Sequence, residues 1–76
     1  MKSNTNISIN DSMYISKTDL EKLKIDASSG NSQAASKLAN YFAFYEFNND
    51  KFIFWLIRSA ELGNTQAQYD LAYIFF

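Results

Sequence analysis

The chain repeats itself at a spacing of 33 residues, and this internal repeat limits the folds open to it more than any other feature. A shift of 33 positions aligns segment 30–43 with segment 63–76, and seven of these fourteen positions are identical. The same shift aligns Leu23 with Leu56. A period of this length with two helices per unit is typical of folds in which each unit buries its apolar face against its neighbours. We therefore predict an all-α fold, a short α-solenoid of about four antiparallel helices.

Capping signals delimit the first two of these helices. Thr18 and Glu21 have the spacing of a capping box, which predicts a helix that starts at Thr18. Gly30 is expected to end that helix with a positive φ, because glycine adopts this conformation at low steric cost. Asn31 can then accept a backbone N–H at the start of a second helix. Apolar residues at intervals of three and four predict that this helix extends to about Phe47.

The same signals recur in the second half of the chain. The polar run 48–50 predicts a tight turn, with Asp50 as the N-cap of a third helix. Gly63 is expected to end that helix with a positive φ, as Gly30 does in the first repeat. Asn64 is then the predicted N-cap of a fourth helix over residues 65–76.

The apolar stripes of these helices predict the core and the domain limits. Residues 16–76 are expected to form the repeat domain, and residues 1–15, which are rich in Asn and Ser, a flexible polar arm. The alternation of Ile7 and Ile9 leaves open a short strand-like segment that docks on a partner. Large residues at equivalent stripe positions are predicted to fill the core: Phe42, Phe52, Trp55, Leu56, Leu71 and Phe75.

Composition excludes most kinds of catalytic and ligand chemistry. The chain contains no cysteine, no histidine and two glycines, so we expect no metal, no cofactor and no glycine-rich phosphate loop. Glu46 and Asp50 are the candidate carboxylate pair, but nothing near them in the sequence predicts an apolar pocket that would raise a pKa. We therefore expect no catalytic residues. A net charge of −1 argues against nucleic acid, since a phosphate backbone demands a basic excess.

The apolar runs are too short for a membrane span. The longest ones, 52–57 and 71–76, hold six residues each, whereas a helix needs about 20 to cross a bilayer. Lys2 precedes no apolar segment of the kind found in signal peptides. The absence of cysteine fits a reducing compartment. We therefore expect a cytoplasmic protein that does not enter membranes.

The chain resembles the Sel-one-like repeats, which are related to the tetratricopeptide repeats. The resemblance covers about residues 20–76 and rests on Lys51, Trp55-Leu56, the run 58–64 (Arg-Ser-Ala-Glu-Leu-Gly-Asn), Ala67-Gln68, Leu71 and Phe75. It implies an α-solenoid that acts as a protein-binding scaffold or adaptor without intrinsic catalysis.

Twelve of the thirteen aromatic residues lie between Tyr41 and Phe76, which is more than the core positions require. Tyr69, Tyr73 and Phe76 have the spacing i, i+4 and i+7 on one face of the fourth helix, and Asn40 is the repeat equivalent of Tyr73. Tyrosine is favoured at interfaces because it combines a large apolar area with a hydroxyl. We predict that these residues bind a partner: Asn40, Tyr69, Tyr73 and Phe76.

Two functional hypotheses remain. The first is a non-enzymatic protein–protein interaction module, a small adaptor or an immunity-type protein. The second is a structural, self-assembling solenoid end that stacks on its own copy. Segment 71–76 is apolar nearly all the way round, and such a helix is normally buried on more than one side. We therefore expect either a complex with another protein or a homodimer through this helix.

Overall fold

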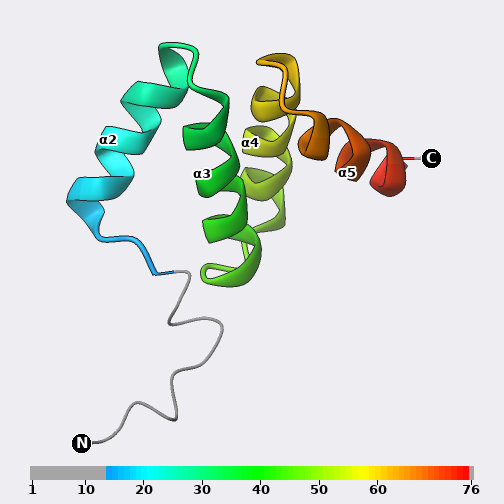
Figure 1. Cartoon of the computed structure of the whole chain (residues 1–76). Coiled ribbons are helices and arrows are strands. Elements are labelled where there is room, and N and C mark those ends of the chain that lie inside the picture. The colour runs from blue at the N-terminus through cyan, green and yellow to red at the C-terminus, as the bar shows by residue number, and fades with distance from the viewer. Residues whose placement is uncertain (1–13, 76) are drawn as a thin grey trace, which may run out of the picture.

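In the computed structural model, the described residues 14–75 form four α-helices and no strand. The helices are α2 (Lys17–Ser28), α3 (Ser32–Phe44), α4 (Asn49–Glu61) and α5 (Thr65–Phe75). Each helix packs on the next one in the chain. Figure 1 shows α2, α3 and α4 side by side in alternating directions, and α5 next to α4. The predicted all-α fold is confirmed. Ile7, Ile9 and nearly all of the predicted N-terminal arm lie outside the described residues.

The two repeats end their helices in the same way. Gly30 has φ +111° and Gly63 has φ +101°, as predicted. At each junction the N–H of the following asparagine bonds to a carbonyl five residues earlier, at 3.0 Å and 3.1 Å. This pattern closes a helix and leaves the asparagine side chain free to cap the next one. Asn31 accepts from Ala34 N at 3.1 Å and Asn64 from Ala67 N at 2.9 Å.

The start of α2 differs from the prediction. The capping box at Thr18 is wrong, because the helix begins earlier and Ser16 caps it, accepting a hydrogen bond from Asp19 N at 3.2 Å. Ile15, which precedes the cap, and Leu20, in the second turn, both pack against the core. This hydrophobic staple favours the earlier start, since it buries two apolar side chains that a start at Thr18 would not join.

The turn between α3 and α4 also differs from the prediction. Helix α3 ends at Phe44 rather than at about Phe47, and Phe47 itself has φ +55°. Asn48 caps α4 and accepts from Lys51 N at 3.1 Å, so the prediction of Asp50 as the cap is wrong. The chain reverses its direction at Phe47, and the next residue, Asn48, is therefore the N-cap of α4.

The core lies along α3, between α2 and α4. Its buried apolar residues are Ala27, Ala34, Ala35, Leu38, Ala39, Tyr41, Phe42, Leu56 and Ala67. The prediction is confirmed for Phe42 and Leu56, whereas Phe52, Trp55 and Leu71 are half-buried at the edge of the core. The core prediction is wrong for Phe75, which is 60% exposed because no described helix covers this side of α5.

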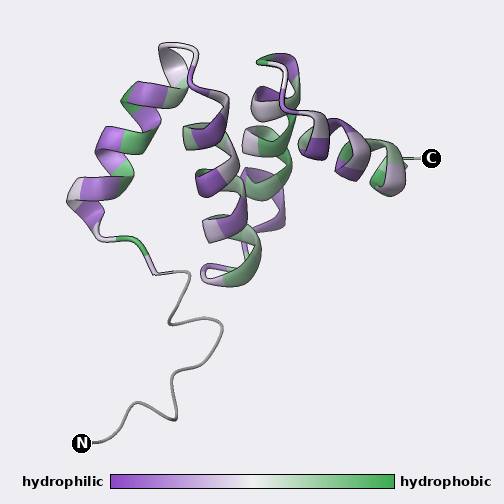
Figure 2. Ribbon diagram, viewed as in Figure 1, coloured by the Kyte–Doolittle hydropathy of each residue, from purple (hydrophilic) through white to green (hydrophobic). Residues whose placement is uncertain are grey.

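Polarity changes along the row of helices. Figure 2 shows hydrophilic residues along much of α2, and hydrophobic residues become frequent in α4 and at the C-terminal end of α5. Among residues 14–75, no helix combines the length and the apolar character that a membrane span requires.

Candidate partner-binding surface

A recess of about 180 Å³ lies between α3 and α5, and it contains one of the four predicted partner-binding residues, Asn40. Its rim is polar and carries two amides and a carboxylate, from Asn40, Gln66 and Asp70. Its floor is apolar and includes Ala39 and Leu56, which are buried. The recess therefore offers hydrogen-bonding groups around a small apolar surface, the combination that fixes a bound segment in place.

A chain of hydrogen bonds positions α5 at this recess. Asn64 Nδ2 donates to Ser36 Oγ at 3.1 Å, and the hydroxyls of Ser36 and Ser59 are 2.5 Å apart. Ser59 Oγ in turn donates to Ser32 O at 3.0 Å. Ser59 is fully buried, so its hydroxyl has to find partners within the protein. Three helices are thereby tied together at the point where α5 begins.

Tyr73 lies on the same side of α5 as the polar rim. It follows Gln66 by seven residues and Asp70 by three, which are the spacings that place side chains on one helix face. Its side chain is 90% exposed, the highest value among the large exposed apolar residues. Asn40, its repeat equivalent on α3, is also exposed. The structure thus places Asn40 and Tyr73 at equivalent positions on adjacent repeats.

Tyr69 lines a different recess. This recess holds about 390 Å³ and is formed by the α5 residues Thr65, Gln68, Tyr69 and Ala72. The repeat equivalent of Tyr69 is Ser36, whose hydroxyl meets Ser59 on α4. Tyr69 therefore lines a recess that Asn40 does not line, although Ser36, its repeat equivalent, lies beside Asn40 in the recess between α3 and α5. Phe76, the fourth predicted residue, lies outside the described residues.

Sequence reasoning missed Gln66 and Asp70. Gln66 Nε2 donates to Asp70 Oδ1 at 3.0 Å, so the two side chains are ordered relative to each other on the surface of α5. Their spacing from Tyr73 was present in the sequence. On the fourth helix the prediction followed aromatic residues alone, and for this reason it selected Tyr69 and overlooked the polar neighbours of Tyr73.

The carboxylate pair considered for catalysis is used structurally. Glu46 Oε2 accepts a hydrogen bond from the hydroxyl of Tyr41 at 3.0 Å, and Asp50 lies exposed in the first turn of α4. Burial of Tyr41 and, secondarily, its bond to Glu46 raise the pKa of Tyr41 to about 12. Tyr41 also stacks on Tyr45 with ring centres 5.3 Å apart. The carboxylate thus anchors an aromatic cluster. No group of side chains suited to a metal ion occurs among residues 14–75.

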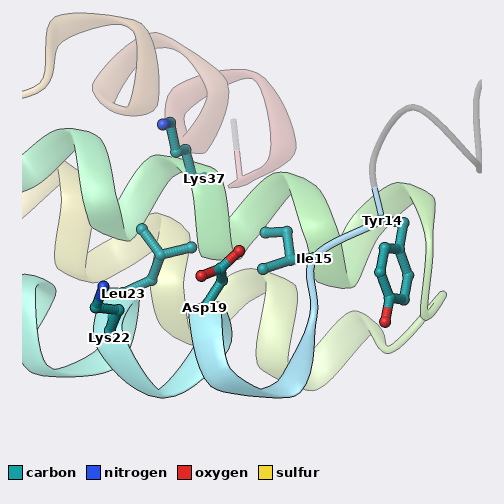
Figure 3. A pocket seen from close by; sticks show the side chains of 6 residues that line it. All are labelled: Tyr14, Ile15, Asp19, Lys22, Leu23 and Lys37. Atoms are coloured by element: carbon teal, nitrogen blue, oxygen red, sulfur yellow. The ribbon is translucent and has the colours of Figure 1, made fainter.

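A third recess, of about 330 Å³, lies at the other end of the row, between α2 and α3 (Figure 3). Two lysines from different helices, Lys22 and Lys37, line it together with Asp19 of α2. Tyr14 and Ile15 close one end, and the ring of Tyr14 meets that of Tyr45 edge to face at 5.4 Å. Its walls combine these exposed charged side chains with the half-buried Ile15 and Leu23.

Comparison of the chain with family models, curated proteins and solved structures found no match. The likeness to Sel-one-like repeats therefore remains a prediction from the residues that carry it.

Proposed function

We propose that this protein is a non-enzymatic protein-binding module, an adaptor or immunity-type protein of the cytoplasm with the α-solenoid architecture of Sel-one-like repeats. The observation that carries the proposal is the recess between α3 and α5, whose polar rim surrounds an apolar floor. Tyr73, three residues after Asp70 on α5, exposes 90% of its side chain to solvent. An exposed tyrosine on the same helix as Gln66 and Asp70 is suited to a protein interface, because buried aromatic anchors dominate binding energy.

The chemistry of the rim indicates the kind of segment that fits. The amides of Asn40 and Gln66 can each donate to and accept from a peptide backbone. The carboxylate of Asp70 favours a basic side chain or a free N–H on the partner. The small apolar floor accepts one compact apolar side chain. The preferred partner is therefore a loop or extended segment with an apolar residue next to a basic one.

The test compares binding with folding in three variants. The partner is first isolated by native co-purification with the full chain and identified. Tyr73→Ala is expected to weaken binding by about 2 kcal/mol with little change in melting temperature, because Tyr73 makes few contacts within the protein. Asn40→Ala should act in the same direction. Leu38→Ala, which removes a fully buried side chain, should instead lower the stability by about 2–5 kcal/mol.

Two outcomes would refute the proposal. If Tyr73→Ala lowers the melting temperature but leaves the affinity of the folded fraction unchanged, Tyr73 serves the fold. If the chain recovers only copies of itself, the second candidate function, self-assembly, takes its place. That candidate is favoured by the exposed apolar side chains of Ile74 and Phe75 on α5.

A further inference from the structure

A third recess at α5 is apolar and open, and it shares Gln68 and Ala72 with the recess that Tyr69 lines. It holds about 440 Å³ between α4 and α5. Phe75 on its wall is 60% exposed and Ile57 is 39% exposed. Six residues line it: Ile57, Ala60, Gln68, Leu71, Ala72 and Phe75. The recess continues the α4–α5 interface outward, so it is the next place in the row where a helix would pack.

The internal repeat shows what this recess corresponds to within the chain. Subtracting 33 from the numbers of the six lining residues gives Lys24, Ala27, Ala35, Leu38, Ala39 and Phe42. All but Lys24 are at most 5% exposed. These five apolar residues belong to the core against which Phe52 and Trp55 of α4 pack. The recess on α5 therefore repeats the surface that α4 covers on α3.

The opposite end of the row does not carry a matching apolar face. Helix α2 is the repeat equivalent of α4, but the positions of Phe52, Trp55 and Ser59 in α4 are taken by Asp19, Lys22 and Asp26 in α2. All three α2 residues are exposed. Stacking a second copy head to tail would place these charges on Leu71 and Phe75, and burying unpaired charges is costly. The polar face of α2 suits an end of the row, where solenoids carry a cap.

Polar contacts around α4 indicate what else a helix bound in this recess would contact. Arg58 Nη2 donates to Ser28 O at 3.3 Å, which joins α4 to the end of α2. The repeat equivalent of Ser28 is Glu61, which is exposed. Its side chain is 62% exposed and lies 4.0 Å from Arg58. A helix placed on α5 as α4 lies on α3 would bring its own arginine to Glu61, where a carboxylate adds an ion pair to the contact.

We propose that the recess between α4 and α5 binds an amphipathic helix of a partner protein, antiparallel to α5 and patterned like α4. The pattern is a large aromatic residue, a Trp-Leu pair three and four residues later, and a basic residue followed by a small one in the last turn. This site is separate from the recess at Asn40, so the proposal stands or falls independently of the function proposed above.

The probe is a labelled peptide with the sequence of residues 48–62, the chain's own α4, added to the folded full chain. Binding is followed by fluorescence anisotropy, and amide NMR shifts locate it. We expect saturable binding below about 1 mM, with shifts at Leu71, Ala72 and Phe75. Ala72→Arg, which places a charged side chain in the recess from an exposed helix position, should weaken binding by about tenfold or more.

Two controls make the result decisive. Thr18→Arg adds the same charge at an exposed position of α2 and should change the affinity by less than about twofold. A peptide with Leu56→Asp should lose binding, since its apolar stripe is broken. Circular dichroism of Ala72→Arg establishes that the variant is folded.

Three results would overturn the proposal. The first is an absence of binding, and the second is equal weakening by Ala72→Arg and Thr18→Arg. The third is a dimer of the chain, seen by sedimentation, that Ala72→Arg abolishes and the peptide does not compete with. In that case the recess is occupied by a second copy through α5.

Discussion

Tyr41, in the last turns of α3, and Phe47, in the turn after α3, each have an energetically unfavourable feature. Tyr41 is 5% exposed, yet its hydroxyl reaches Glu46, so burial leaves no unpaired phenol. Phe47 has φ +55°, a conformation that costs a residue with a Cβ about 1–2 kcal/mol, while 68% of its side chain remains exposed. The first residue stabilises the junction and the second carries strain there, so substitutions at the two should act in opposite directions.

Tyr41 should make stability fall at high pH. Its pKa is raised to about 12, whereas the unfolded phenol titrates near 10, so both states are neutral below pH 10 and the stability is complete there. Between pH 10 and 12 the unfolded chain loses the proton first, and the free energy of unfolding should fall by up to about 2–3 kcal/mol. Urea unfolding at pH 8 and pH 11.5 measures this loss. Tyr41→Phe should show a smaller one, and an equal loss in both proteins would contradict the assignment.

Phe47→Gly should stabilise the protein. Glycine adopts φ +55° without steric cost, so we expect the free energy of unfolding to rise by about 0.5–1 kcal/mol, net of the entropy that glycine adds to the unfolded chain. Phe44→Gly, three residues earlier at the last residue of α3, should instead lower it by up to about 1 kcal/mol. Thermal melts of both variants provide the comparison. A loss of stability in both would mean that the Phe47 side chain contributes more than its backbone costs.

At the scale of the elements, the helices are joined by polar contacts as well as by apolar ones. The hydrogen-bond chain from Asn64 through Ser36 and Ser59 to Ser32 O crosses α3, α4 and the start of α5. Gln68 Nε2 adds a bond to Ala60 O at 3.1 Å. These bonds have defined directions, so they fix the angle of α5, which apolar packing alone would leave less specified.

Ser59→Ala should loosen this junction. The substitution removes the donor to Ser32 O and the neighbour of Ser36 without changing the size of the side chain greatly. We expect a loss of about 1–3 kcal/mol in the free energy of unfolding, because buried polar groups are left without a partner. Chemical denaturation measures the loss. Ser36→Ala, at a partly buried position, serves as the comparison, and an unchanged stability in Ser59→Ala would show that packing alone sets the angle.

At the scale of the whole molecule, neighbouring helices bury α5 less than they bury α3. Helix α3 packs between α2 and α4, whereas α5 packs mainly on α4. Six residues of α3 are buried, and one residue of α5, Ala67, is buried. Local opening requires less free energy where fewer apolar contacts are lost. We therefore expect the chain to be most stable in its centre and less stable in α2 and α5, which have one buried residue each.

Hydrogen exchange should reproduce this order. The amides of Leu38 and Phe42 in α3 are expected to exchange only on global unfolding, because they lie in the best covered helix. The amides of Leu71 and Phe75 in α5 should exchange faster by about tenfold or more. Exchange followed by NMR at neutral pH gives the rates residue by residue. Equal protection in α3 and α5 would show that α5 is stabilised as strongly as the centre of the row.

The sequence by itself determined the features that depend on neighbours along the chain. Both glycine junctions, both asparagine caps after them and the order of the four helices follow from local chemistry, and all agree with the structure. The role of Asn40 in partner binding was predicted from its repeat relation to Tyr73, and it remains a prediction. The local signals failed where two caps competed, as at Ser16 and Thr18, because packing of Ile15 decided between them.

Only the tertiary structure decided which of two equivalent residues is buried. Phe42 and Phe75 are identical in type and repeat position, yet they are 5% and 60% exposed. Ala39 is 1% exposed and Ala72, its equivalent, is exposed. The structure likewise brought Asn40, Gln66 and Asp70 to one recess, which neither Tyr69 nor Tyr73 lines. Burial depends on whether another helix lies against a given face, and a residue's own sequence neighbourhood does not contain that information.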